Sequence, residues 1–133
     1  MPTNIRFLNP APLSKPPGYT QVVEVTGGRT VYIAGQLGID QSGALVGPDF
    51  RAQAVQVFEN LKAALAAVGG NFEHVVKVTN LLADISHLPV FREVREQYLN
   101  KAAPPASTTV AISQFARPGA LLEVEAVAVL PPA

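Results

Sequence analysis

The sequence predicts an α+β domain, in which one mixed β-sheet carries two helices on one of its faces. Two segments repeat apolar residues at the spacing of a helical face, and five or six others are short and rich in β-branched residues. Their order is β-β, helix, β, helix, β-β. Because 48% of the 133 residues are hydrophobic and only 15% are charged, the chain can bury a sizeable core. We expect a single domain over residues 1–133.

The expected strands are short runs bounded by glycine, proline or polar turn residues. They cover residues 5–8, 20–26, 29–36, 74–83, 107–113 and 120–130. Gly27-Gly28 tolerates positive φ and is typical of a tight turn, so we expect residues 20–26 and 29–36 to pair as a hairpin. Asp40 and Gly43 mark a second turn.

Two helices are expected between these strands. Asp49 suits the N-cap of the first helix, which should end at Gly69-Gly70. Its apolar face consists of Ala54, Val57, Phe58, Leu61, Leu65 and Val68. Ser86 can cap the second helix, and Pro104-Pro105 prevents its continuation. The core stripe of that helix is Val90, Phe91, Val94 and Tyr98.

The last strand has two largely apolar faces, and helices on one side of the sheet can cover only one of them. One face carries Leu122, Val124, Ala126, Ala128 and Leu130, and the other carries Leu121, Glu123, Glu125, Val127 and Val129. An apolar sheet face that no helix covers predicts self-association through that face. The alternative is that one chain closes into a barrel or sandwich.

Composition argues against several classes of protein. Ten basic residues balance ten acidic ones, which disfavours a nucleic-acid or anionic-membrane surface, because both need a basic excess. The chain has no cysteine, so disulfides, thiol nucleophiles and Cys-ligated zinc are excluded. No apolar run approaches the ~20 residues of a transmembrane helix. Residues 1–10 lack the apolar core of a secretory signal, so we expect a cytoplasmic protein.

Glu123 and Glu125 are the first candidates for chemistry. Two residues apart on a strand, they emerge on the same face about 6.5–7 Å from each other. Among apolar neighbours, such a pair raises the pKa of at least one carboxyl or requires a cation beside it. A carboxylate in that setting can act as a general base or acid. The alternative is that both are solvated or salt-bridged across the sheet.

The remaining polar residues carry weaker signals. His74 and His87 show no metal-ligand spacing, so we expect surface or capping roles and no metal site. A solvated helix face is expected for the mixed charges Arg92, Glu93, Arg95 and Glu96. Arg92 is less ordinary, because it lies at the edge of the apolar stripe. A long side chain there can follow apolar surface and project its charge into a cleft.

Several motifs are spread over nearly the whole chain. They are Pro17-Gly18-Tyr19, VYIAGQ at 31–36, Gln53, FENL at 58–61, VVKVT at 75–79, Pro105-Ala106 and EVEA at 123–126. Together they resemble the RidA/YjgF family, also called endoribonuclease L-PSP. The resemblance implies a chorismate-mutase-like α+β fold. It also implies a homotrimer around a central β-barrel, with small-molecule ligand clefts between subunits.

The resemblance further implies an activity and a set of site residues. Active members hydrolyse reactive enamines and imines, such as 2-aminoacrylate, to 2-keto acids and ammonia, and they need no metal or cofactor. Glu123 matches the catalytic glutamate that positions the attacking water. Tyr19 matches a tyrosine that lines the cleft, and Gly35 matches a glycine that borders it. Thr109 matches a position whose backbone amide helps to hold the ligand.

Two positions depart from the family pattern. Ser107 occupies the place of the arginine that binds the substrate carboxylate, and Ala34 stands where a serine is common. Loss of the guanidinium removes roughly 1.5–3 kcal/mol of charged hydrogen bonding. We hypothesise that Arg92 enters the cleft and supplies the missing charge, while Ser107 and Thr109 hydrogen-bond the ligand. The alternative is that Arg92 is an ordinary surface residue.

Three functions compete at this point. The first is a cofactor-free deaminase of small reactive metabolites, and the second is a non-catalytic trimeric binder that keeps the cleft without the chemistry. The third is the ribonuclease activity in the family's name. It ranks last, because the net charge is zero and no His/Lys/Glu constellation for phosphodiester cleavage can be recognised.

Overall fold

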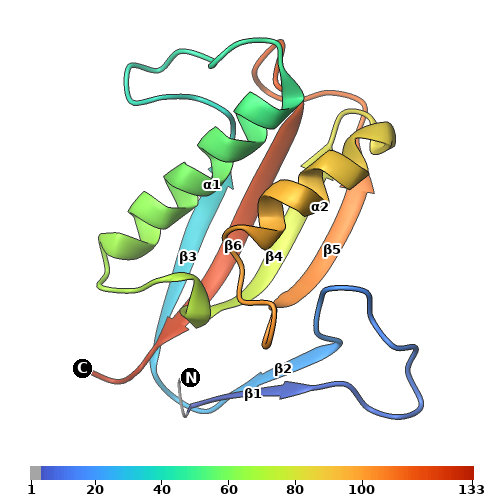
Figure 1. Ribbon diagram of the computed structural model, residues 1–133. Coiled ribbons are helices and arrows are strands. Elements are labelled where there is room, and N and C mark those ends of the chain that lie inside the picture. Colours follow the sequence, from blue (N-terminus) through green and yellow to red (C-terminus); the bar gives the residue numbers. More distant parts are fainter. Residues whose placement is uncertain (1–3) are drawn as a thin grey trace.

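Four strands form the central sheet of the computed structural model, which describes residues 4–133. Their order is β3 (Arg29–Gln36), β6 (Leu122–Leu130), β4 (Val75–Leu82) and β5 (Ala106–Ala111) (Figure 1). β4 and β5 are parallel, and the other neighbours are antiparallel. The helices α1 (Phe50–Ala66) and α2 (Leu88–Glu96) both lie on one face of the sheet (Figure 1). The predicted α+β architecture is therefore confirmed.

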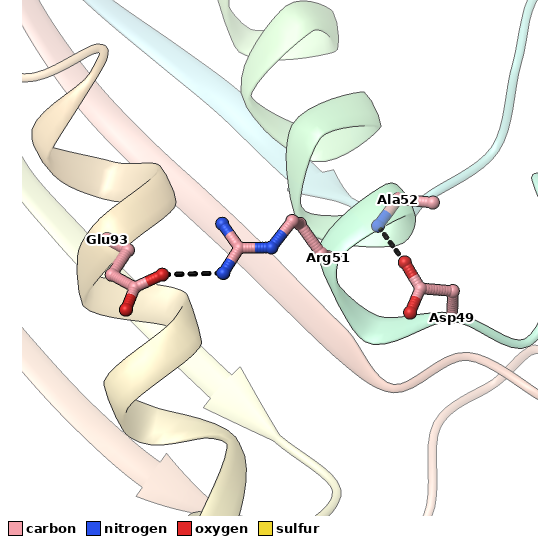
Figure 2. A network of polar contacts seen from close by, with 4 residues as sticks. All are labelled: Asp49, Arg51, Ala52 and Glu93. Carbon is pink, nitrogen blue, oxygen red and sulfur yellow. Dashed lines mark hydrogen bonds and ion pairs between the residues drawn. The ribbon is translucent and has the colours of Figure 1, made fainter.

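Helix α1 forms where its predicted cap and apolar stripe place it. The Asp49 carboxylate accepts a hydrogen bond from the Ala52 amide at 2.9 Å, which satisfies a free N–H of the first turn (Figure 2). Arg51 joins α1 to α2 at the surface through an ion pair with Glu93 at 2.5 Å (Figure 2). Beneath this pair, both helices bury their apolar faces against β6 and β4 in one core. No helix in residues 4–133 is long and apolar enough to cross a membrane.

The start of α2 differs from the prediction that Ser86 caps it. The N-cap residue is His87, whose side chain makes no capping bond. A 3₁₀ turn, η2 (Ile85–His87), comes directly before the helix, and Asp84 accepts a hydrogen bond from the Ser86 amide at 2.9 Å. That bond lowers the pKa of Asp84. The capping function thus falls two residues earlier, on the turn that leads into the helix.

The predicted hairpin between residues 20–26 and 29–36 is wrong. β2 (Val22–Val25) pairs with β1 (Ile5–Leu8) in a separate two-stranded sheet, and β3 pairs with β6. Gly28, at φ +95°, lies where the chain passes from the small sheet to the large one. A Cβ on it would lie 2.5 Å from the Leu130 carbonyl oxygen. The two glycines therefore form a corner between sheets, because β1 and β6 supply the partners that the two strands do not give each other.

The second face of the large sheet is partly covered by the chain itself. Ile5 of β1 packs with Val76 and Val129, and Phe7, Val23, Val25 and Val127 join this second apolar cluster. The expectation of a bare face therefore holds only beyond the β1–β2 ribbon. In that uncovered part Tyr32 is 81% exposed. The alternative of a closed barrel is wrong for this chain, because β3 and β5 are the two edges of an open sheet.

An aromatic cluster closes one end of the core. Phe58 stacks on Tyr98, with 5.2 Å between ring centroids, and Phe72 meets Tyr98 edge-on at 5.7 Å. The Tyr98 hydroxyl donates a hydrogen bond to the Glu59 carboxylate at 2.7 Å. Burial, together with this neighbouring carboxylate, raises the pKa of Tyr98 to about 12.

The raised pKa of Tyr98 predicts a loss of stability in strong base. The neutral phenol favours the folded state fully below its unfolded pKa of about 10, and this contribution is lost as the pH rises toward about 12. Across that window, the free energy of unfolding of the wild type should fall more steeply than that of Tyr98→Phe. Urea denaturation of both proteins at several pH values measures the difference. If the free energies of unfolding of the two proteins changed in parallel with pH, the raised pKa of Tyr98 would be contradicted.

Candidate functional site

The six predicted site residues fall into two groups on opposite faces of the sheet. Glu123 belongs to the residues of β6 that alternate with the buried Leu122 and Val124, so it emerges on the face without helices. Ser107 and Thr109 on β5 emerge on the helix side, where both contact the buried side chain of Asn80. The first group consists of Glu123 and Gly35, and the second of Tyr19, Arg92, Ser107 and Thr109.

In the first group, a bulge in β3 makes room for the Glu123 carboxylate. Ile33 pairs with Ala126 and Gln36 with Val124, so Ala34 and Gly35 together oppose the single residue Glu125. A Cβ on Gly35 would lie 2.5 Å from Oε2 of Glu123 and 2.8 Å from its Cδ. Glycine is therefore the only residue at position 35 that lets the Glu123 carboxylate stay where it is.

Among residues 4–133, no cation and no hydrogen-bond donor pairs with the Glu123 carboxylate. Glu123 is half-buried and Glu125 is exposed. Neither carboxylate takes part in an ion pair or hydrogen bond with residues 4–133, so the salt-bridged alternative does not hold within one chain. Glu123 is therefore available to a water molecule or a ligand.

The second group lines one pocket of about 270 Å³ between α2, β5 and the loop before β2. Its lining residues are Pro17, Tyr19, Ile85, Leu88, Arg92, Arg95, Ser107 and Thr109. Arg92 is exposed at this pocket, as the hypothesis of a cleft arginine requires, but it lies on the face of the sheet opposite Glu123. Within one chain, the sheet itself separates the two groups.

Asn80 organises the two hydroxyl groups of the pocket. Its side chain is 1% exposed, and Nδ2 donates to Ser107 Oγ at 2.9 Å and to Thr109 Oγ1 at 3.1 Å. Each hydroxyl oxygen accepts one bond, so its O–H remains free to donate into the pocket. Sequence reasoning did not single out Asn80. A polar residue amid the apolar, β-branched run 75–82 was the available signal.

Arg95 is the second residue that sequence reasoning missed. It was expected on a solvated helix face, yet only 8% of it is exposed. Burial lowers the pKa of Arg95, and the positive charge of Arg92 lowers it further, while Glu96 acts in the opposite direction. Position 95 follows Phe91 by one helical turn, so it lies beside the apolar stripe of α2. This spacing was the signal in the sequence.

The two histidines take structural roles. His74 Nδ1 accepts a hydrogen bond from the Asn71 amide at 3.0 Å, in the capping box of the 3₁₀ turn η1 (Phe72–His74). The His87 ring stacks on Phe50 with 4.3 Å between centroids. Among residues 4–133, no three His, Cys, Asp or Glu side chains gather to form a metal site.

A larger depression of about 610 Å³ between β3 and α1 is less suited to chemistry. Gly35 borders it, but Glu123 does not line it. Two of its polar side chains are engaged, since Glu59 accepts a hydrogen bond from Tyr98 and Asn60 donates to the carbonyls of Leu37 and Ile39. The pocket beside α2 and the carboxylate beside Gly35 are therefore the two parts from which a site can be built.

Known proteins resemble this chain in sequence and in fold. The family described as endoribonuclease L-PSP matches residues 11–130. A 2-iminobutanoate/2-iminopropanoate deaminase from Homo sapiens is 39% identical over 90% of this chain and 88% of its own length. Protein DfrA from Myxococcus xanthus is 41% identical over 84% of each chain. The crystal structure of YyfB, a Rid-family protein of unknown function from Yersinia pestis, matches with a TM-score of 0.86 at 32% identity, covering 96% of this chain and all of that one.

Proposed function

The chain belongs to the endoribonuclease L-PSP family, and on that premise we propose that it hydrolyses small imines and enamines to carbonyl compounds and ammonia. The observation that carries the proposal is the Glu123 carboxylate, which is half-buried and has no partner within residues 4–133. This carboxylate occupies space that Gly35 leaves open because it has no side chain. The human relative named as a 2-iminobutanoate/2-iminopropanoate deaminase supports the same chemistry.

The working site, in this proposal, is shared between copies in a homotrimer around a central β-barrel. Glu123 and the pocket beside α2 lie on opposite faces of one sheet, so one chain cannot direct both at the same molecule. The uncovered part of the second face, with Tyr32 81% exposed, favours contact with a neighbouring copy. Glu123 of one copy would then face the pocket at the β5 edge of the next. Sedimentation equilibrium showing a monomer at micromolar concentration would refute this arrangement.

The proposed chemistry needs one water and one proton carrier. Glu123 accepts a proton from water as the water oxygen forms a bond to the imine carbon, and it passes that proton to the imine nitrogen, which gives a neutral carbinolamine. The carbinolamine loses ammonia when Glu123 accepts its hydroxyl proton and delivers that proton to the nitrogen as the C–N bond breaks, which leaves the carbonyl compound. An enamine first gains a proton on carbon and loses one from nitrogen, which converts it to the imine. No electron acceptor is involved, so atoms and charges balance with water alone.

Ammonia release from freshly generated 2-iminobutanoate tests the role of Glu123. Glu123→Gln keeps the size of the side chain and removes the base, and we expect a fall in kcat of about 100-fold or more. Glu125→Gln is the matched control, because it is two residues away on the same face and exposed. Its rate should stay within about twofold of the wild type. Equal rates for Glu123→Gln and the wild type would remove Glu123 from the mechanism.

A non-catalytic binder of small metabolites is the second candidate, and Ser107 favours it. The resemblance implies an arginine at that position, and its absence weakens the hold on a substrate carboxylate. A binder predicts a rise in melting temperature with ligand, but no ammonia release above the uncatalysed rate. The ribonuclease reading remains last, because no basic surface excess supports it.

A further inference from the structure

Arg95 has a buried guanidinium to which no other residue of the described part of the chain is bonded. The residue is 8% exposed, and its side chain makes no hydrogen bond or ion pair with residues 4–133. A buried cation without a partner opposes folding, so proteins normally give such a group an acid or a set of carbonyls. Here the five N–H donors of the guanidinium are left available.

Neither acid of the same helix forms an ion pair with Arg95, although the charge of Glu96 is near enough to raise the pKa of Arg95. Glu93 pairs with Arg51 at 2.5 Å, and Glu96 pairs with Lys101 at 3.8 Å. The loop opposite the helix instead makes room for the guanidinium. Gly18 has a φ of +97°, and a Cβ on it would lie 2.8 Å from Nη2 of Arg95. The positive φ of Gly18 favours glycine, and the absence of a side chain at this position leaves room for the Arg95 guanidinium.

On the side of the pocket of about 270 Å³, the groups around Arg95 are donors and positive charge. Arg92 lines the same pocket of about 270 Å³, and Ser107 and Thr109 accept from Asn80, which leaves their O–H groups free to donate. No carboxylate lines this pocket. Its volume lies just below the ~300–1,000 Å³ typical of ligand sites, which suits a metabolite of a few heavy atoms.

We infer that Arg95 is the anchor for a small carboxylate, with Arg92 at the exposed side of the same pocket and the Ser107 and Thr109 hydroxyls as further donors. A guanidinium forks two N–H groups toward a carboxylate in parallel, which fixes the orientation of the anion as well as its position. The identity of this anion as the carboxylate end of an imino acid rests on the proposed function. The anion site itself rests only on the pocket.

Calorimetric titration with sodium 2-oxobutanoate, the product that hydrolysis of 2-iminobutanoate would release, tests the anchor without any turnover. We expect the wild type to bind it in low salt, and Arg95→Met to weaken binding by about 10- to 100-fold. Arg6→Met is the matched control, because Arg6 is an exposed arginine paired with Glu24 on the small sheet. It should bind as the wild type does. Butan-2-one, which lacks the carboxylate, should not bind to any of them.

Two further readouts separate the outcomes. Arg95→Met should melt at or above the wild-type temperature, because it removes an unpaired buried charge, whereas a merely structural arginine would lower the melting temperature when replaced. Glu123→Gln should still bind 2-oxobutanoate, so failure of the deaminase proposal leaves this test intact. Unchanged binding by folded Arg95→Met, or no binding by the wild type, would overturn the inference.

Discussion

Replacing Gln53 with leucine is expected to lower the free energy of unfolding by about 3 kcal/mol, because one side chain makes three hydrogen bonds worth about 1 kcal/mol each. Gln53 is fully buried on α1. Its Nε2 donates to the carbonyls of Gly47 at 2.8 Å and Gly119 at 3.1 Å, and its Oε1 accepts from the Leu121 amide at 2.9 Å. Leucine has a similar volume, so the loss measures the hydrogen bonds rather than a cavity.

Gln53 connects helix α1 to two loops and to the start of β6. The substitution can therefore also affect the candidate base on β6. Leu121 is two residues before Glu123, so Gln53 also sets where the last strand begins. Gln56→Leu is the control, because it lies on the same helix and makes one hydrogen bond, to Asn60 at 2.8 Å. It should cost about 0.5 kcal/mol or less. Urea denaturation of both variants measures the difference, and equal stabilities would show that the three bonds contribute nothing net.

The substitution Gly35→Ala is expected to reduce kcat/KM for imine hydrolysis by about 100-fold while leaving the fold intact, since a misplacement of about 1 Å in a reacting group costs that much. The new Cβ would lie 2.5 Å from Oε2 of Glu123. The carboxylate is the far end of a flexible side chain, so it moves aside and the backbone does not. Circular dichroism and the melting temperature should therefore change little.

A double-mutant cycle shows whether Gly35 acts through Glu123. In the Glu123→Gln background, with the base already gone, Gly35→Ala should lower the remaining rate by less than about threefold. Ala44→Ser adds one atom to an exposed residue outside the bulge and serves as the control, with a rate close to the wild type. A full 100-fold loss in both backgrounds would mean that the glycine acts on the ligand or the backbone and not on the carboxylate.

Local pattern predicted the elements but not the pairing of every strand. The apolar spacing of α1 and the alternation in β6 each follow from residues close in sequence, and both agree with the structure. Gly27-Gly28 predicted a change of direction correctly and a hairpin wrongly, because a turn signal does not name the partner of the strand that follows it. β3 pairs with β6, about a hundred residues away, and no local signal encodes that choice.

The candidate site divides in the same way. Glu123, Gly35, Tyr19, Ser107 and Thr109 could be named from motifs in the sequence. Arg95 and Asn80 lie outside these motifs, and their weaker signals were outweighed because one looked like part of a solvated helix face and the other like part of an apolar strand. Their importance depends on which groups from other elements lie against them, such as Gly18 and the two hydroxyls of β5.

The sequence by itself determined the fold class, the two helices, the alternation of the last strand and the candidate base, because these depend on side-chain periodicity within one element. Only the tertiary structure decided that β1 and β2 cover part of the second face, that Glu123 and the α2 pocket lie on opposite sides of the sheet, and that Arg95 is buried without forming an ion pair within residues 4–133. Those features depend on contacts between residues that are distant in the chain. Whether a side chain is buried or ion-paired is decided by these contacts, so no single segment of sequence predicts it.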